Sequence, residues 1–419
     1  MEIPFSANFP PYTQYHPQVP VWCVTPRVRG CLHRGVDTSP ISPSGRYLAV
    51  TRLIAEHRLP ALDERADILV IDLIEGRSHM VALSAAYDTV MGAQVQWGQT
   101  DHELYFNDLD TKTWQVHGVR LDPITGERRV LGGPIYALSP DGKRAASSCL
   151  LRLGLTQPGL GAMVPPHALP LNEGASGLDG LYLTYTETGK SRLELSFRDM
   201  LDILQPAIPW GRHTGGAFYG GPVSWNPQGT RLLMVLRYRP NEARARIAEY
   251  VVTLALGGRT REAYQAISSD QWQRGGQQPR WCPDGEHLLI NLNLHGTGLR
   301  TVRVKYDGTN PEELTPKITG SGLPSLHQNG RFILTDAQMQ EPMGFVDGSV
   351  PLRWIDLKTQ SETTLARVKV RPPYIGPNNI FAIQPAPVFD RSHNYAIFNA
   401  CPEGFRQIFL MDLRPVLPR

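Results

Sequence analysis

The sequence has few cysteines, no long apolar run and little excess charge, and each absence excludes a class of protein. Its five cysteines are an odd number, and no two are spaced as Cys-x-x-Cys. We therefore expect buried, reduced thiols in a reducing compartment, with a Cys23–Cys31 disulfide as the alternative. No stretch approaches the roughly 20 apolar residues of a membrane helix, so we expect no membrane span.

Residues 1–19 contain neither a basic start nor an apolar run, so they are not typical of a signal peptide. The expected location is the cytoplasm, or outside the cell if a leader was removed before the first residue. The net charge is only +3. So small a surplus does not indicate a dedicated nucleic-acid surface, although a local basic pocket stays open.

Motifs of several enzyme classes are also absent. There is no Gly-x-Ser-x-Gly, no phosphate-binding loop, no dinucleotide fingerprint and no His-Glu-x-x-His. We therefore expect no serine hydrolase of the nucleophile-elbow type, and no peptidase in which a propeller guards a catalytic domain. No two histidines have metal-ligand spacing on one element, so the residues alone predict no metal site.

What the sequence does have is 39 glycines and 36 prolines, many of them in turns between short apolar runs. One unit recurs seven times: an apolar run, a turn of the Pro-x-Gly or Asp-Gly kind, and a second apolar run. The copies span residues 38–52, 95–108, 136–148, 223–237, 279–293, 324–336 and 386–400. Each is followed by a further alternating strand, which is typical of the blades of a propeller.

We therefore predict an all-β fold, a single seven-bladed β-propeller that covers residues 1–419 after an N-terminal extension, 1–19. The last unit stops near Leu413 without an outermost strand, and PVWCVTP, residues 20–26, is predicted to supply that strand and close the ring. Two insertions, 150–180 and 191–221, are predicted as loops, the second with a short helix in SRLELSFRDMLDILQ. Long loops in compact domains often carry function.

The residues that flank each hairpin should share one rim, because the innermost strand of a blade starts at the face to which its partner returns. Tyr136 precedes the third hairpin and Arg152 follows it, so both are predicted to reach the central mouth. Amides and arginines at this rim suit the hydroxyls and the carboxylate of an acidic sugar, and Tyr219 could supply a stacking face. The other predicted substrate-binding residues are His33, Arg34, Gln94, His117, His213, Arg237, Gln278 and Gln384.

Each of these residues also has a structural alternative. Blade-edge side chains such as Asp336 commonly tie loops together. Arg237 could instead form a salt bridge between blades, and Tyr136 by itself could be a packed aromatic residue. The roles of His117 and His213, in loop-like or strand-end positions, stay open.

The hairpins, with the closing stretch QPAPVFDRSHNYAIFNACPEGFRQIFLMDL, resemble the seven-bladed propeller polysaccharide lyases, which include oligogalacturonate, ulvan and rhamnose–glucuronate lyases. The resemblance extends from about Pro20 to Leu413. In ulvan-type lyases a Tyr followed by an Arg sixteen residues later serves the chemistry, and Tyr136 and Arg152 match that spacing. The resemblance implies that Tyr136 acts as general acid or base and that Arg152 holds the substrate carboxylate.

The sequence departs from this pattern at the metal site. Oligogalacturonate lyases carry a Gln and a His-x-His at the start of the last blade, which bind a divalent metal together with a His two blades earlier. Here Gln384 and Ala386 stand at the histidine positions, and Gln278 stands at the earlier one. Gln94 likewise stands where ulvan-type lyases tend to have His. The resemblance therefore implies that the metal ligands are replaced and that no cofactor is needed.

Two functions follow. The first is a metal-independent lyase that cleaves an anionic, uronate-containing polysaccharide or oligosaccharide by β-elimination, with an arginine stabilising the enolate-like transition state. The second is a non-catalytic propeller that binds a glycan or a protein at the same mouth. Glycoside hydrolysis is a further alternative, but the sequence offers no convincing carboxylate pair for it. We expect neither a nucleic-acid nor a membrane partner.

Overall fold

The computed structural model describes residues 5–35, 38–209, 213, 215–242, 245–256, 261–276 and 279–418. Their contacts divide the chain into two compact units. Unit one comprises Met1–Thr111, Val119–Arg129 and Ser321–Arg419, and unit two comprises Lys112–Gly118 and Val130–Gly320. The single domain inferred from the sequence stays a prediction.

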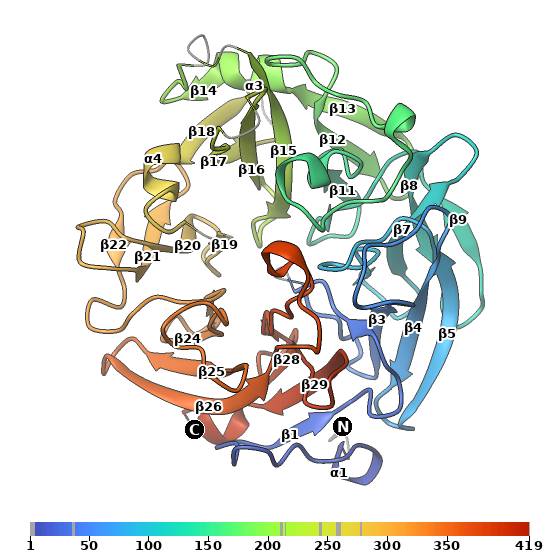
Figure 1. The fold of residues 1–419 in the computed structure, drawn as a ribbon, viewed down its shortest axis with the longest axis vertical. Coiled ribbons are helices and arrows are strands. Elements are labelled where there is room, and N and C mark those ends of the chain that lie inside the picture. Colours follow the sequence, from blue (N-terminus) through green and yellow to red (C-terminus); the bar gives the residue numbers. More distant parts are fainter. Residues whose placement is uncertain are drawn as a thin grey trace. The chain divides into compact units, whose positions relative to one another are not determined.

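The described residues form seven sheets, which confirms the predicted all-β fold of a seven-bladed β-propeller (Figure 1). Six of the sheets have four strands and one has five. Strand pairing is antiparallel, apart from the short parallel pair of β14 (Leu204–Gln205) with β18 (Glu262–Ile267). Because consecutive strands pair through short turns, each glycine-containing hairpin of the sequence becomes the inner half of one blade.

Three sheets lie wholly in unit one. The first contains β2 (Cys31–Leu32), β3 (Tyr47–Arg52), β4 (Ala66–Asp72) and β5 (Arg77–Ser84). The second contains β23 (Ser325–Leu326), β24 (Phe332–Thr335), β25 (Ser349–Asp356) and β26 (Ser361–Lys369). The third contains β27 (Val388–Phe389), β28 (Tyr395–Ala400), β29 (Gln407–Asp412) and β1 (Val21–Cys23). Short helices in this unit are α1 (Phe5–Asn8), η3 (Pro377–Asn379) and η4 (Arg414–Val416).

Three further sheets lie in unit two. The first contains β10 (Ala137–Leu138), β11 (Arg144–Ser147), β12 (Gly180–Tyr185) and β13 (Ser191–Ser196). The five-stranded sheet adds β15 (Gly216–Trp225), β16 (Arg231–Pro240) and β17 (Ala248–Ala255) to β14 and β18. The third contains β19 (Arg280–Trp281), β20 (His287–Leu292), β21 (Arg300–Lys305) and β22 (Glu312–Glu313). The helices are α2 (Leu153–Thr156), η1 (Pro166–Ala168), α3 (Phe197–Ile203) and α4 (Ser269–Trp272).

The remaining sheet has residues in the chain ranges of both units. It contains β6 (Gln96–Trp97), β7 (Leu104–Asp110), β8 (Gln115–Leu121) and β9 (Arg128–Val130).

Burial explains which apolar runs become which strands. Every residue of the middle strand β4, ADILVID, is buried, because side chains on both faces of a blade pack against neighbouring sheets. The outer strand β5 is exposed over its first four residues, RSHM, and ends the sheet. A blade of this fold therefore combines buried apolar middle strands with a polar outermost strand.

The N-terminal strand closes the last sheet of unit one, as predicted. Strand β1 pairs with β29 in the register Val21↔Met411 and Cys23↔Phe409 (Figure 1). Val21 is 2% exposed and belongs to the core shared by this sheet and that of β23–β26. The last blade is thus built from residues at opposite ends of the chain.

The second predicted insertion is only partly a loop. The stretch expected to hold a helix begins with strand β13, because SRLELS alternates with the period of two that suits a strand. The helix α3 starts afterwards at Phe197, where the Ser196 hydroxyl accepts a hydrogen bond from the backbone N–H of Asp199. Strand β15 begins at Gly216, within the predicted insertion.

All five cysteines are free thiols, and four of them are buried. Burial raises the pKa of Cys23, Cys31 and Cys401 to about 12. These thiols stay protonated at neutral pH and behave as small apolar core residues, whereas the alternative of a Cys23–Cys31 disulfide is not formed.

The closure strand gives the first testable prediction. Val21→Asp would place a charge in the core beside β29 and should destabilise the protein by at least about 3 kcal/mol. Thermal unfolding followed by circular dichroism measures this effect. Met80→Asp is a matched control, because Met80 lies on the edge strand β5 and is 60% exposed. Equal melting temperatures for the two variants would contradict closure by β1.

Candidate functional site

In unit one, Asn399 connects two of the residues predicted for the rim, His33 and Gln384. The backbone N–H of His33 donates to Oδ1 of Asn399 at 3.1 Å, and Nδ2 of Asn399 donates to the carbonyls of His33 and Gln384, both at 3.4 Å. His33, Arg34 and Gln94 are 3%, 5% and 2% exposed, while Gln384 is exposed. The structure thus brings His33 and Gln384 together, but through their backbones.

Asp336 acts on the backbone as well, which favours the loop-tying alternative for this residue. Its carboxylate accepts from the backbone N–H groups of Leu323 at 2.7 Å and Ala386 at 3.0 Å. The methyl group of Ala386 fills the space beside Gly35, where an added Cβ would stand 2.7 Å away. Position 386 therefore contributes packing to the start of the last blade.

The described residues do not provide the ligand set with which oligogalacturonate lyases bind a divalent metal. No three His, Cys, Asp or Glu side chains gather in a metal-binding arrangement anywhere in the described part of the chain. Ala386 has no donor atom, and Gln278 lies outside the described residues. The proton transfer proposed below therefore uses side chains alone.

In unit two, the tyrosine and the arginine predicted to be catalytic occupy different surroundings. Tyr136 is fully buried and its backbone N–H donates to the carbonyl of Ala146. Strand β11 ends at Ser147, so Arg152 does not end the returning strand as expected but stands at the N-cap of α2. The regular hairpin is shorter than predicted because the insertion begins at Ser148.

Arg152 already has a carboxylate partner. Its Nη1 lies 2.7 Å from Oδ2 of Asp179, and its Nε donates to the carbonyl of Pro170 at 2.8 Å. Asp179 also accepts from Asn172 at 2.7 Å and from the hydroxyl of Tyr182 at 3.2 Å. Because Asp179 and Pro170 already occupy Nη1 and Nε, a substrate carboxylate would have to share the guanidinium with Asp179 or displace it, and the role of Arg152 stays a prediction.

Arg237 is likewise paired, on one face of the β15–β17 sheet. Its Nε lies 2.8 Å from Glu249, and its Nη2 donates to Gln157 of the insertion at 2.7 Å. Among the described residues, Nη1 has no hydrogen-bond partner and packs on Gly221, where an added Cβ would stand 3.0 Å from it. Tyr219 is directly opposite Arg237 in the strand register and is 3% exposed.

His213 lies in an aromatic cluster that the sequence did not predict. Its Nε2 is 3.1 Å from the hydroxyl of Tyr250, and its ring centroid is 4.2 Å from that of Tyr238 and 5.6 Å from that of Phe218. Burial lowers the pKa of His213 and raises that of Tyr250. Both groups are therefore neutral at neutral pH, and His213 is the half-buried member of a cluster whose other rings are buried.

Strand alternation separates His213 from Arg237. Arg237 and Tyr238 are consecutive in β16, and Glu249 and Tyr250 are consecutive in β17, so their side chains leave opposite faces of the sheet. The Arg237–Glu249 pair thus lies on one face and the His213–Tyr250 pair on the other. His117, the remaining predicted histidine, lies half-buried within strand β8.

Asp179, Asn172 and Tyr250 were missed because no local pattern marks them. Tyr250 sits in the strand EYVVTLA like any core aromatic residue, and nothing in that stretch indicates that its hydroxyl lies 3.1 Å from Nε2 of His213. Asp179 stands directly before β12, which is a weak signal for a residue that organises an insertion.

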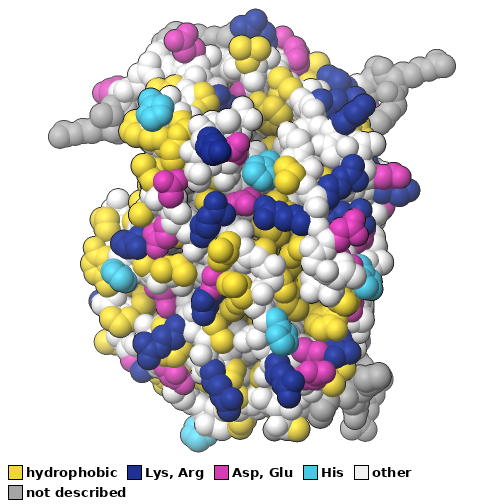
Figure 2. All heavy atoms as spheres, turned by 90° about the vertical axis from the view of Figure 1, so that its right-hand side faces the viewer, with side chains coloured by type: hydrophobic (Ala, Val, Ile, Leu, Met, Phe, Trp, Pro, Cys, Tyr) yellow, Lys and Arg dark blue, Asp and Glu magenta, His cyan; other side chains and the backbone are white. Residues whose placement is uncertain are grey.

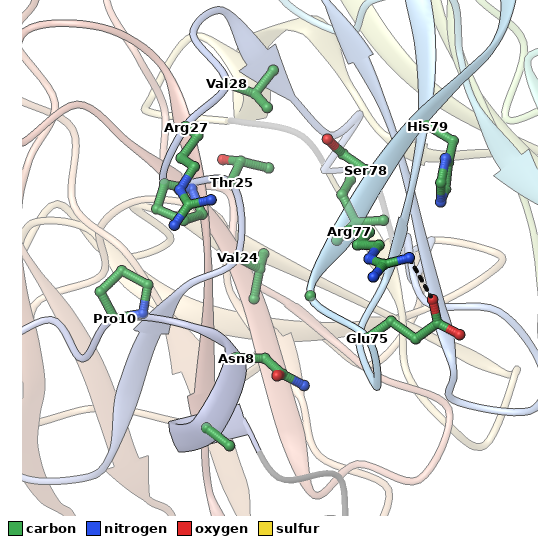
Figure 3. Close-up of a pocket in the computed structure, with 14 residues that line it drawn as sticks. Asn8, Pro10, Val24, Thr25, Arg27, Val28, Glu75, Arg77, Ser78 and His79 are labelled. Carbon is green, nitrogen blue, oxygen red and sulfur yellow. Dashed lines mark ion pairs between the residues drawn. The ribbon is translucent and has the colours of Figure 1, made fainter.

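A hollow of about 610 Å³ occurs in unit one, but it contains none of the predicted site residues (Figure 3). It is bounded by α1, by the chain that follows β1 and by the start of β5. On the face shown in Figure 2, basic and acidic side chains are interspersed. No helix in the described part of the chain is long and apolar enough to span a membrane.

Comparison with known proteins identifies the fold. No protein-family model matches the chain, and no curated protein is similar in sequence. An oligogalacturonate lyase in complex with manganese superposes with a TM-score of 0.63 at 13% identity, over 98% of this chain and 96% of that chain. An oligogalacturonate lyase from Vibrio parahaemolyticus gives 0.64 at 13% identity, over 97% and 96%. The tricorn protease gives 0.51 at 10% identity, over 93% of this chain but 34% of that chain. Identities this low establish a shared propeller fold alone.

The contacts of Asp179 give the second prediction. Asp179→Asn would leave the guanidinium of Arg152 without a counter-charge and should cost about 3–5 kcal/mol, as for other broken buried ion pairs. We expect a lower melting temperature and faster proteolytic cleavage within residues 150–179. Asp141→Asn, in the exposed turn of the same blade, is the control. If Asp179→Asn unfolds and is cleaved like the wild type, Asp179 does not anchor the insertion.

Proposed function

We propose that this chain is a lyase that cleaves a uronate-containing oligosaccharide by β-elimination, with His213 as the proton-transfer group. The observation that carries the proposal is the 3.1 Å contact between Nε2 of His213 and the hydroxyl of Tyr250 inside an aromatic cluster. It is supported by the likeness of fold to two oligogalacturonate lyases over nearly the full length of both chains.

The pair suits proton transfer in the following way. If Nε2–H donates to the Tyr250 oxygen, the neutral imidazole leaves Nδ1 unprotonated and able to act as a base. Nδ1 of His213 removes the C5 proton, the electron pair forms the C4–C5 double bond, and the C4–oxygen bond breaks. The imidazolium then returns the proton to the departing C4 oxygen, so that atoms and charge balance. Tyr250 is a positioning residue that selects the tautomer.

Acidity at C5 requires a cation near the substrate carboxylate. Arg152 stays our prediction for this role, and it would bind the substrate carboxylate beside or in place of Asp179. Arg237 lies on the opposite face of the β15–β17 sheet from His213, so it stays a predicted substrate-binding residue that would not contact the same uronate. Manganese is described for one similar lyase. The reaction proposed for this chain uses none, and the described residues contain no cluster of three His, Cys, Asp or Glu side chains that could hold a metal ion.

A non-catalytic sugar-binding propeller is the second candidate. It is favoured by the full burial of Tyr136 and by the carboxylate partners of both arginines, because neither catalytic residue inferred from the resemblance is free to meet a substrate. The two candidates differ in whether bound uronate glycans are cleaved.

The third prediction separates these candidates. On oligogalacturonate, ulvan, rhamnosyl-glucuronate gum or glucuronan, the protein should generate ultraviolet absorbance from an unsaturated uronate, with or without chelator. His213→Asn should lower kcat by about 10²–10⁴, the usual contribution of general acid–base catalysis. His295→Asn, at a side chain that is 70% exposed, is the matched control.

Tyr136→Phe tests the residue assigned by resemblance, and it should retain activity if His213 carries the reaction. If Tyr136→Phe loses activity and His213→Asn keeps full activity, Tyr136 is the general acid or base and His213 is not. Binding of a glycan by calorimetry without any absorbance change would identify a sugar-binding propeller.

The fourth prediction concerns pH. A base works only when unprotonated, and burial lowers the pKa of His213 below its ordinary 6.5. Activity should therefore be independent of pH just above 6.5 and fall only at lower pH. Tyr250→Phe removes the acceptor that stabilises the imidazolium, so the fall should move to still lower pH. An acidic limb centred above 6.5, or one that Tyr250→Phe moves upward, would contradict the assignment.

A further inference from the structure

The hollow at the outer edge of unit one has the dimensions of a ligand site. Its volume of about 610 Å³ falls within the range of roughly 300–1,000 Å³ that is usual for small-molecule pockets. One wall is formed by Ala7, Asn8 and Pro10, a second by residues 24–28 after β1, and a third by Ile71 and residues 75–79. None of these residues belongs to the candidate sites described above.

The inner part of the hollow is apolar. Val24 and Ile71 are core residues, 2% and 1% exposed, and each also lines the hollow. Pro10, Pro26 and Val28 extend this surface outward. Because Val24 and Ile71 present little surface, a ligand seated here would place a ring or a short apolar body against Pro10, Pro26 and Val28.

Two arginines line the hollow from different walls. Arg27 belongs to the chain after β1 and Arg77 to the start of β5 (Figure 3). Arg27 is exposed and forms no ion pair with any described residue. Arg77 lies 3.9 Å from Glu75, at the outer limit of an ion pair, and its side chain is 74% exposed.

The carboxylate of the hollow is committed elsewhere. Glu75 lies closer to Arg46, at 3.3 Å, and Arg46 in turn lies 2.6 Å from Asp72. The group formed by Arg46, Asp72 and Glu75 has a net charge of −1, which neutralises one of the two arginines of the hollow. The other arginine therefore leaves the hollow with a net positive charge. Unlike Arg152 and Arg237, these guanidinium groups would not need to give up a buried partner to bind an anion.

Strand β5 adds further donors. It is the last strand of its sheet and pairs only with β4 among the described strands, so alternate backbone N–H groups point away from that partner. Ser78 and His79, in the same stretch, also line the hollow, with their side chains on opposite faces of the strand. Backbone N–H groups beside two arginines are typical of sites that hold oxyanions.

We propose that this hollow binds a small anionic molecule, a carboxylate or phosphate carried on a ring or short apolar body. Arg27 and Arg77 hold the anionic group, and Pro26 and Val28 receive the body of the molecule. The site is independent of the proposed lyase activity, because it shares no residue with His213, Tyr250 or the two paired arginines.

Calorimetric titration of the full chain tests the site. The probes are galacturonate, glucose 6-phosphate and inorganic phosphate, with galactose as the neutral control. We expect binding of at least one anion and none of galactose. Arg27→Ser with Arg77→Ser should weaken that binding by about tenfold or more, as expected when charge-assisted hydrogen bonds are lost. The affinity for galacturonate, compared with that for inorganic phosphate and glucose 6-phosphate, shows whether the site prefers a carboxylate or a phosphate.

A matched pair and a filling variant control for charge and folding. Arg65→Ser with Lys358→Ser removes the same charge from exposed positions outside the hollow and should leave binding within about twofold. Ser78→Tyr should block the hollow without changing its charge. Binding that survives both pocket variants, or no binding of any anion to the wild type, would overturn the proposal. Lyase activity that the Arg27→Ser and Arg77→Ser variant retains while anion binding is lost would separate this site from the lyase site.

Discussion

A buried arginine must keep a counter-charge, and unit two is organised around this constraint. Desolvating a guanidinium costs several kcal/mol unless a carboxylate and further acceptors surround it. Asp179 meets this need for Arg152 and at the same time gathers Asn172 and Tyr182, which fixes the insertion against β12. Glu249 and Gln157 do the same for Arg237. Arg152 and Arg237, which the sequence predicts to bind a substrate, are thus already paired with carboxylates of the protein. An anionic substrate would compete with Asp179 or Glu249 for the guanidinium.

The second constraint is the alternation of side chains along long strands. Strands β15 and β16 are ten residues each, longer than most strands in the described sheets, and so present two chemically different faces. One face carries Arg237 with Glu249, and the other carries Tyr238 and Tyr250 around His213. A one-residue shift in register would exchange these faces. The bulge between Gly220 and Val223 shifts the register of β15 against β16, so it sets how the segment with Phe218 and Tyr219 pairs relative to the rest of the strand.

The fold could be predicted because its signal is local and repeated. Seven turns with Pro, Asp and Gly between apolar runs specify seven hairpins, and the missing last strand specifies closure by Val21–Cys23. The site could not be predicted to the same degree. The spacing of Tyr136 and Arg152 was real, but spacing does not reveal that Ser147 ends the strand or that Asp179 meets Arg152. Likewise, His213 was named from its loop-like position, whereas its partner Tyr250 depends on the pairing of β16 with β17.

Two kinds of arginine therefore coexist in this chain, and they differ in what an anion gains by binding them. At Arg152 and Arg237 an incoming carboxylate replaces an existing one, so net binding depends on the difference between two similar contacts. At Arg27 it displaces no described ion-pair partner and at Arg77 only the long contact with Glu75, and its apolar body gains contact with Pro26 and Val28. Weakly held simple anions should consequently bind at the outer edge of unit one first. Binding at the buried arginines requires a ligand whose other groups, such as the hydroxyls of an extended sugar, offset the loss of Asp179 or Glu249. The same requirement would make the buried site selective for oligosaccharides over free anions.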